Sequence, residues 1–120
     1  MASPSAALSV NGAIIATGDI SGFQTSDIRF KDNVVTINTN AALQKILALR
    51  VTEFDWIDEE VEQSEYVSSL NKGHDVGLIA QEVQKVFPDA VFERPDGSLA
   101  INYPKLIPYL IAAIQNPYKA

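Results

Sequence analysis

The sequence predicts a small mixed domain of the α+β class, with short strands, about three helices and a segment of short N-terminal strands ahead of them. Two helices follow from apolar residues at helical spacing, one after position 40 and one before Pro88. A third follows from the nearly continuous apolar run of residues 106–114. Short β-prone runs separated by turn residues make up most of the remainder. A chain of 120 residues supports one domain with at most a small appendage.

The composition excludes several classes of protein. Apolar residues make up 47% of the chain, which is enough for a core and too much for a disordered chain. There is no cysteine and only one histidine, His74, so we expect no disulfide, no metal site and no cofactor. The net charge of −6, with scattered Lys and Arg, argues against a nucleic-acid partner. No apolar run is long enough to span a bilayer and no secretory signal is present, so we expect a soluble chain made in a cytoplasm, without a membrane partner.

Residues 1–25 predict short strands. Asn11-Gly12 lies between two β-prone runs and is a strong hairpin signal, and Gly18 and Gly22 mark further turns. About six large apolar side chains in this segment are too few for a lone two-stranded ribbon. The strands therefore either pair with other copies of the chain or lie on the chain's own core, and the sequence leaves both possibilities open.

The candidate chemical site is Ser26-Asp27-Ile28-Arg29-Phe30-Lys31. A neutral lysine amine can take the proton of a serine hydroxyl, whose oxygen can then attack a peptide carbonyl. On these residues alone, a turn serine followed by a solvated lysine is the commoner explanation. Ser26 and Lys31 are five positions apart, so a straight strand would place them on opposite faces. A bend, a bulge or a neighbouring chain is needed to bring them together.

The next segment predicts a short strand and then a helix. Residues 34–37 form the strand, and Asp32-Asn33 supplies the turn before it. Asn40 can cap a helix over residues 41–49, whose apolar positions recur at helical spacing.

Residues 51–57 alternate in polarity, which predicts a strand with Phe54 and Trp56 on its core face. Glu53 and Asp55 occupy the other face, where a solvent-exposed surface explains them better than paired acid–base catalysis. An acidic connection follows, and it lacks the spacing of an EF-hand. We therefore expect a solvated loop, rather than a metal cage, at its acidic residues Asp58, Glu59, Glu60, Glu62 and Glu65.

The last third of the chain predicts a helix, a hairpin and a final helix. Residues 76–78 begin a buried strand or a strand-to-helix junction, and the helix runs to Phe87, where Pro88 ends it. The turn Pro95-Asp96-Gly97 joins two hairpin strands. The final helix should begin near Lys105, with Pro108 in its first turn. Because this helix is apolar on all sides, it must be covered all round, and we expect another subunit to supply part of the cover.

Four motifs occur in this order: Ser26-Asp27-x-Arg29-x-Lys31, Val76-Gly77-Leu78-Ile79-Ala80-Gln81-Glu82-Val83, Phe87-Pro88 and Asn102-Tyr103-x-x-Leu106-Ile107-Pro108. Together they resemble a known family, the phage intramolecular chaperone domain, also called the peptidase S74 or endosialidase C-terminal domain. The likeness covers roughly residues 26–115. It implies a homotrimeric domain at the end of viral tail fibres and tailspikes, which aligns three chains while an upstream β-stalk folds and then cleaves itself off.

The resemblance also implies Ser26 as the nucleophile and Lys31 as the base. A lysine base needs a pKa lowered by desolvation, since a solvated amine is protonated at pH 7. The candidate cleavage positions are Thr25, Ser26 and Asp27. A hydroxyl reaches the preceding carbonyl through a five-membered ring, which favours the Thr25–Ser26 bond, and the choice of bond stays open.

We therefore divide the chain into an N-terminal attachment or fibre segment, residues 1–25, and a chaperone-like domain, residues 26–120. The short upstream part offers little stalk to release. Our first expectation is a virion protein made in the host cytoplasm, a small homotrimeric tail fibre or tip component that keeps its chaperone-type domain. Its N-terminal strands would contact neighbouring phage tail or baseplate proteins.

Two alternatives remain. The first is a self-cleaving intramolecular chaperone, an autoendopeptidase that acts once in cis through Ser26 and Lys31. The second is a binding module for a host surface, suggested by Tyr66 and Tyr118.

Overall fold

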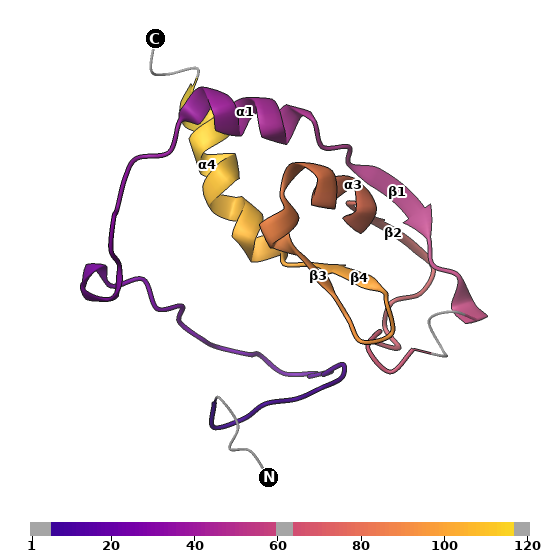
Figure 1. Ribbon diagram of the computed structural model, residues 1–120. Coiled ribbons are helices and arrows are strands. Elements are labelled where there is room, and N and C mark those ends of the chain that lie inside the picture. Colours follow the sequence, from indigo (N-terminus) through magenta and orange to yellow (C-terminus); the bar gives the residue numbers. More distant parts are fainter. Residues whose placement is uncertain (1–5, 60–63, 117–120) are drawn as a thin grey trace. The chain divides into compact units, whose positions relative to one another are not determined.

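The computed structural model describes residues 6–59 and 64–116, so Glu60, Glu62 and Tyr118 lie outside the described residues. The described part is a small mixed fold of helices and short strands, as predicted (Figure 1). It divides into two compact units. The first unit contains Met1–Asp27 and Glu53–Asp75, and the second contains Ile28–Thr52 and Val76–Ala120. No helix among the described residues is both long enough and apolar enough to cross a membrane.

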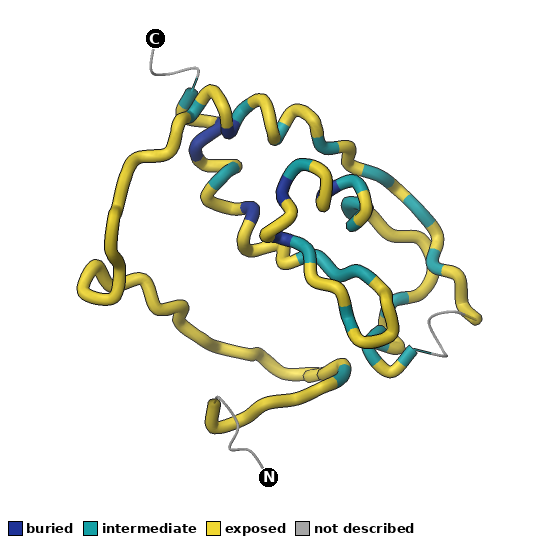
Figure 2. The backbone as a smooth tube through the Cα atoms, in the orientation of Figure 1, coloured by how far each residue is buried: buried dark blue, intermediate teal, exposed yellow. Residues whose placement is uncertain are grey.

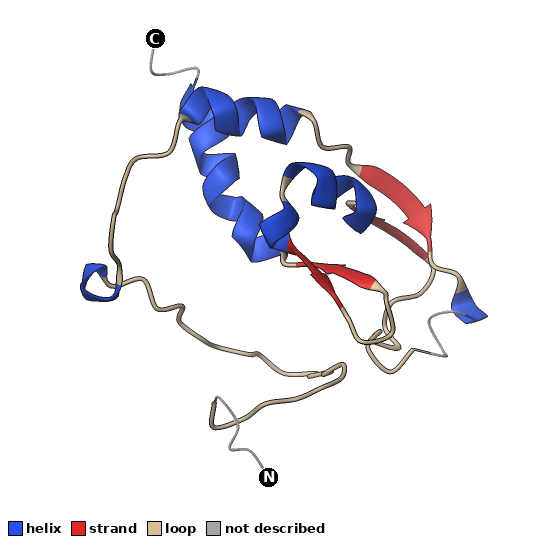
Figure 3. Cartoon of the chain, viewed as in Figure 1, coloured by secondary structure: helices blue, strands red, loops and turns tan. Residues whose placement is uncertain are grey.

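Residues 6–27 of the first unit contain no strand, and Figure 3 draws this segment as loop. The N-terminal strands that the sequence predicts are therefore not seen in the single chain. A strand needs a neighbour to pair its backbone N–H and C=O groups, and this segment has too few apolar residues to hold a ribbon together alone. One backbone hydrogen bond, from Ala13 N to Glu65 O at 3.3 Å, ties it to the later part of the same unit.

Strands β1 (Thr52–Asp55) and β2 (His74–Gly77) form a two-stranded sheet. β1 is shorter than the predicted 51–57, and its alternation is as expected. Thr52 and Phe54 are half-buried, whereas Glu53 and Asp55 are exposed, so the two acids lie on the solvent side. The rings of Phe54 and Trp56 meet edge to face with their centroids 5.0 Å apart.

Helix α1 (Thr39–Leu47) packs against helix α4 (Ile107–Gln115) in the second unit (Figure 1). The side chains buried on these two helices are small: Ala42 on α1, and Ala112 and Ala113 on α4. Thr39 Oγ1 donates to Asn116 Oδ1 at 3.1 Å and joins the start of α1 to the end of α4.

The predicted start of the first helix was wrong by two residues. Asn38, and not Asn40, is the N-cap, and its Oδ1 accepts a hydrogen bond from Ala41 N at 2.9 Å. Asn40 lies in the first turn instead. Both are asparagines, a residue type that suits a cap, so residue type alone does not distinguish them.

The buried core of the second unit lies where helix α3 (Ala80–Val86) and the 3₁₀ turn η2 (Pro88–Ala90) meet the chain before α4 (Figure 2). Val83, Phe87, Ala90 and Leu106 form it. Pro88 stops α3, as predicted, because proline cannot donate the next intrahelical hydrogen bond.

The predicted hairpin is confirmed. Strands β3 (Val91–Glu93) and β4 (Leu99–Ile101) pair antiparallel with Phe92 opposite Ala100. The turn uses Asp96 Oδ1 as acceptor for Ser98 N at 2.9 Å, and Gly97 adopts a φ of 88° that glycine tolerates best.

The final helix begins at Ile107, two residues after the predicted Lys105. The 3₁₀ turn η3 (Tyr103–Leu106) leads into α4, and Pro108 lies in the first turn of α4. Although α4 is apolar all round, the chain covers only part of it. Four of its large apolar side chains stay exposed: Ile107, Leu110, Ile111 and Ile114.

Candidate functional site

The candidate dyad segment is exposed throughout. Thr25, Ser26 and Asp27 have no assigned secondary structure and lie just before the 3₁₀ turn η1 (Ile28–Phe30). Lys31 N donates to Ile28 O at 3.1 Å and closes this turn. A 3₁₀ turn therefore lies between Ser26 and Lys31 in the sequence.

The two dyad residues belong to different units. Ser26 belongs to the first unit and Lys31 to the second. Both side chains are exposed. A lysine acts as a base only when its amine is desolvated, and the described part of one chain does not bury Lys31. The chemistry of this pair therefore depends on a cover that one chain does not supply.

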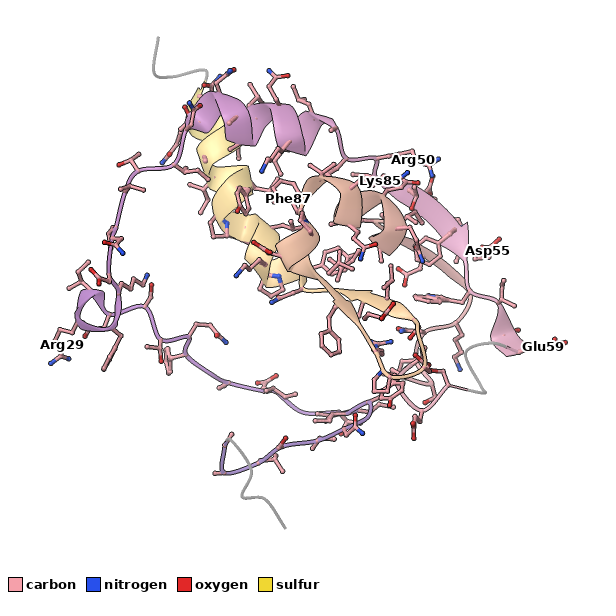
Figure 4. All side chains as sticks on the ribbon, in the orientation of Figure 1. Arg29, Arg50, Asp55, Glu59, Lys85 and Phe87 are labelled. Atoms are coloured by element: carbon pink, nitrogen blue, oxygen red, sulfur yellow. The ribbon has the colours of Figure 1, made fainter. Side chains whose placement is uncertain are left out.

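An extended apolar segment continues from the dyad. We call residues 28–37 the apolar arm. It turns at Asn33, which has a φ of 53° and donates its backbone N–H to Asp32 Oδ1 at 2.8 Å. The turn is as predicted, but no strand is assigned to residues 34–37. The large apolar side chains of the arm are all exposed: Ile28, Phe30, Val34, Val35 and Ile37. Figure 4 shows Arg29 projecting from the η1 turn at the start of the arm.

The second unit also carries an apolar groove of about 410 Å³. Its walls come from the end of α1 and the residues after it, from the chain before α3, and from η3 with the first turns of α4. The lining residues are Ile46, Leu49, Val51, Leu78, Tyr103, Pro104, Leu106, Ile107 and Leu110. We call this feature the apolar groove.

The polar groups beside the apolar groove are already bound. Tyr103 contributes its ring, while its hydroxyl accepts a hydrogen bond from Leu78 N at 3.0 Å. Arg50 lies between the lining residues Leu49 and Val51 in sequence. Its guanidinium donates two hydrogen bonds to Glu82 on α3, Nε to Oε1 at 3.2 Å and Nη2 to Oε2. The hydrogen bond from Arg50 lowers the pKa of Glu82. The groove therefore presents an apolar surface to whatever enters it.

A polar cluster lies on β1 and β2 in the first unit. His74 Nδ1 lies 2.9 Å from Asp55 Oδ1, and His74 Nε2 lies 3.2 Å from Glu53 Oε1. Both ring nitrogens must donate to satisfy both carboxylates, which favours the imidazolium form. The hydrogen bond to Asp55, and then that to Glu53, raises the pKa of His74. Beside this pair, Trp56 Nε1 donates to Asp75 Oδ2 at 3.0 Å.

This geometry predicts a pH dependence. A pKa raised by folding gives stability that is fully present below the unfolded pKa of about 6.5 and is lost as the pH rises through the higher folded value. Because His74 is the sole histidine, its imidazole resonance in an NMR titration reports this pKa directly. We expect a value above 6.5 in the native chain and a lower one after Asp55→Asn.

Asp89→Asn serves as the control, since Asp89 lies on η2, away from the cluster in sequence, and should leave the titration of His74 unchanged. A native value at or below 6.5, or an equal shift in both variants, would contradict the geometry of the cluster.

The sequence suggested some of these features and not others. It placed Glu53 and Asp55 on a solvent face, and it left a bend, a bulge or a neighbouring chain as the means of bringing Ser26 and Lys31 together. It gave no sign that His74 joins those acids, because the partner strand follows a connection of about twenty residues. The apolar groove was also missed, since its walls come from distant positions.

Within residues 6–59 and 64–116, no group of three or more His, Asp or Glu side chains is arranged to hold a metal ion.

Comparison with known proteins adds a family and several relatives. The family model described as chaperone of endosialidase, Peptidase S74, matches residues 26–92. The chain is 38% identical over 92 residues to Myelin regulatory factor homolog 1 of Caenorhabditis elegans, which is 77% of this chain and 10% of the relative. It is 34% identical over 80 residues to an uncharacterized protein of Dictyostelium discoideum, 67% of this chain and 6% of the relative.

A third relative, an uncharacterized membrane protein of Dictyostelium discoideum, is 34% identical over 96 residues, which is 73% of this chain and 5% of that protein. The chain thus spans a tenth or less of the length of these curated relatives.

Proposed function

Because this chain belongs to the chaperone-of-endosialidase family, we propose that it is a homotrimerising chaperone-type domain that is kept as a structural part of a phage tail fibre or tip. In this proposal three copies associate through the second unit. The N-terminal segment, residues 1–25, attaches the trimer to neighbouring tail or baseplate proteins.

Unburied apolar surface is the observation that carries the proposal. On α4, the side chains of Ile107, Leu110, Ile111 and Ile114 are about half exposed or more. The apolar arm and the apolar groove add to this surface within the same unit. Exposed apolar surface of this extent is typical of association sites in soluble proteins, because leaving it in water is costly.

The exposure of the candidate dyad favours a retained domain over a cleaved one. Ser26 and Lys31 are both exposed, so the single chain does not enclose a reaction site around them. The alternative, self-cleavage next to Ser26, requires that neighbouring copies cover and desolvate Lys31. In that case the same trimer would act once as an autoendopeptidase.

The organisms of the relatives matter for the proposed location in a phage particle. They come from a nematode and a social amoeba, so the domain also occurs outside phages. The proposed virion location is supported by the likeness of the motifs to those of tail fibres and tailspikes. Mass spectrometry of purified phage particles that carry the gene should detect the chain, and its absence from them would contradict the virion role.

Two measurements on the purified chain test the proposal. Light scattering after gel filtration should give about three times the chain mass of 13.1 kDa, and denaturing mass spectrometry should give one uncut species. Ser26→Ala and the native chain should have the same mass, apart from the lost oxygen. Lys31→Ala should likewise give one uncut species. Lys72→Ala is its control, because it removes a lysine outside the dyad.

Other outcomes would favour the self-cleaving alternative or contradict the trimer. If the native chain yields two fragments while Ser26→Ala and Lys31→Ala stay whole, the self-cleaving reading replaces the structural one. If the chain sediments as a monomer at micromolar concentration, the trimer proposal fails in both forms.

A further inference from the structure

We propose that the apolar groove of one copy receives the apolar arm, residues 28–37, of a second copy. This inference rests on the proposed homotrimer and names the surfaces that join its subunits.

The arm has apolar side chains that its own chain does not cover. Ile28 is 67% exposed, Phe30 75% and Val35 85%. No strand is assigned to residues 34–37 in the described structure, so no sheet partner in the chain holds them and they can lie along another surface. An extended segment with apolar side chains is a suitable occupant for an apolar groove.

The groove is suited to the arm in chemistry. Its lining is apolar, the Tyr103 hydroxyl is bound to Leu78 N, and the Arg50 guanidinium is bound to Glu82. An entering peptide therefore has no unsatisfied polar group to pair with at these positions, and apolar side chains are the groups it can bury there at least cost.

The charge of the arm also favours another copy of this chain as its partner. Arg29, Lys31 and Asp32 give the arm a net charge of +1, from two basic residues less one acidic residue. The whole chain has a net charge of −6, so the remainder carries −7. A positively charged arm is attracted to a strongly acidic body, and this attraction raises the rate of encounter.

The path of the chain explains why the occupant is a second copy. The arm runs directly into Asn38, the cap at the start of α1, whereas Ile46 and Leu49 line the groove at the far end of that helix. To fill its own groove the arm would have to fold back along all nine residues of α1, about 14 Å. An arm that reaches the next copy instead makes a head-to-tail contact, and such contacts form a closed ring when the rotation between copies closes, as the proposed homotrimer requires.

Disulfide trapping tests this pairing cleanly, because the native chain has no cysteine. Chains with Leu110→Cys in the groove are co-expressed with chains carrying one arm change, Phe30→Cys, Val34→Cys or Val35→Cys. After mild oxidation, at least one pair should give a crosslinked species of twice the chain mass that neither chain forms alone. Val10→Cys, an exposed valine outside the arm, is the matched control and should not crosslink.

A second measurement follows the strength of association. Phe30 is not part of the buried core, so Phe30→Ala should keep the helix content seen by circular dichroism. The protein concentration at which the assembly dissociates should rise at least about tenfold. The reason is that the variant lacks the phenyl group that the native arm buries in the groove of the neighbouring copy.

The outcomes distinguish this proposal from the one on which it rests. A trimer with no arm-to-groove crosslink overturns the arm docking and leaves the homotrimer standing. A crosslink within a dimer supports the docking and overturns the homotrimer. A double variant, Val35→Cys with Leu110→Cys, that closes only within a single chain shows that the arm fills its own groove and overturns the docking.

Discussion

Replacing Phe87 with alanine is expected to lower the free energy of unfolding by about 3–5 kcal/mol, as for other large aromatic residues removed from a core. Phe87 is only 4% exposed, and its ring lies 4.6 Å, centroid to centroid, from that of Tyr109 on α4. The Lys45 ammonium of α1 also lies over the ring, 5.6 Å from its centroid. Phe87, labelled in Figure 4, therefore connects the end of α3 with both long helices of the second unit.

Phe92→Ala is the matched control, since it makes the same chemical change at a phenylalanine that is 65% exposed. Urea unfolding followed by circular dichroism, at one fixed protein concentration, should show a large loss of stability for Phe87→Ala and a small one for Phe92→Ala. Equal losses in the two variants would mean that Phe87 does not hold the core together as described.

Replacing Ala112 with leucine is expected to cost about 1–3 kcal/mol through overpacking. Ala112 is 2% exposed on α4, and α1 packs on α4 through Ala42, which is equally buried. Helices approach closely where the contact residues are small, and the added methyl groups of a leucine have no free volume to enter. The hydrogen bond from Thr39 to Asn116 limits how far the two helices can separate.

Ala41→Leu is the control for this change, because Ala41 is exposed on α1, next to buried Ala42. The same urea titration should find Ala41→Leu close to the native chain in stability and Ala112→Leu clearly below it. If Ala112→Leu is as stable as the native chain, the contact between α1 and α4 is looser than its alanines indicate.

Local chemistry was enough to predict several elements. Pro88 stops α3 and Pro108 lies in the first turn of α4, because proline lacks a backbone donor wherever the chain places it. The turn with Asp96 and Gly97 formed its hairpin because both residues act within four positions of each other. The alternation in β1 also followed from side-chain polarity alone.

Elements that need a distant partner could not be predicted in this way. Asn40 was predicted as the cap, whereas Asn38 caps α1, and the next residue, Thr39, bonds Asn116 at the end of α4. The predicted strands in residues 1–25 and 34–37 have the right residue types, yet a strand also needs a neighbour, and the single chain supplies none in the described segments.

The amino-acid order alone determined the family motifs, the turns, the helix ends at prolines and the polarity of each strand face. These depend on neighbours within a few residues. Only the three-dimensional packing could join His74 to Asp55, or close a groove between Ile46 and Leu110. Such sites arise from residues far apart in the chain, whose meeting is set by how the whole core packs and not by any local preference.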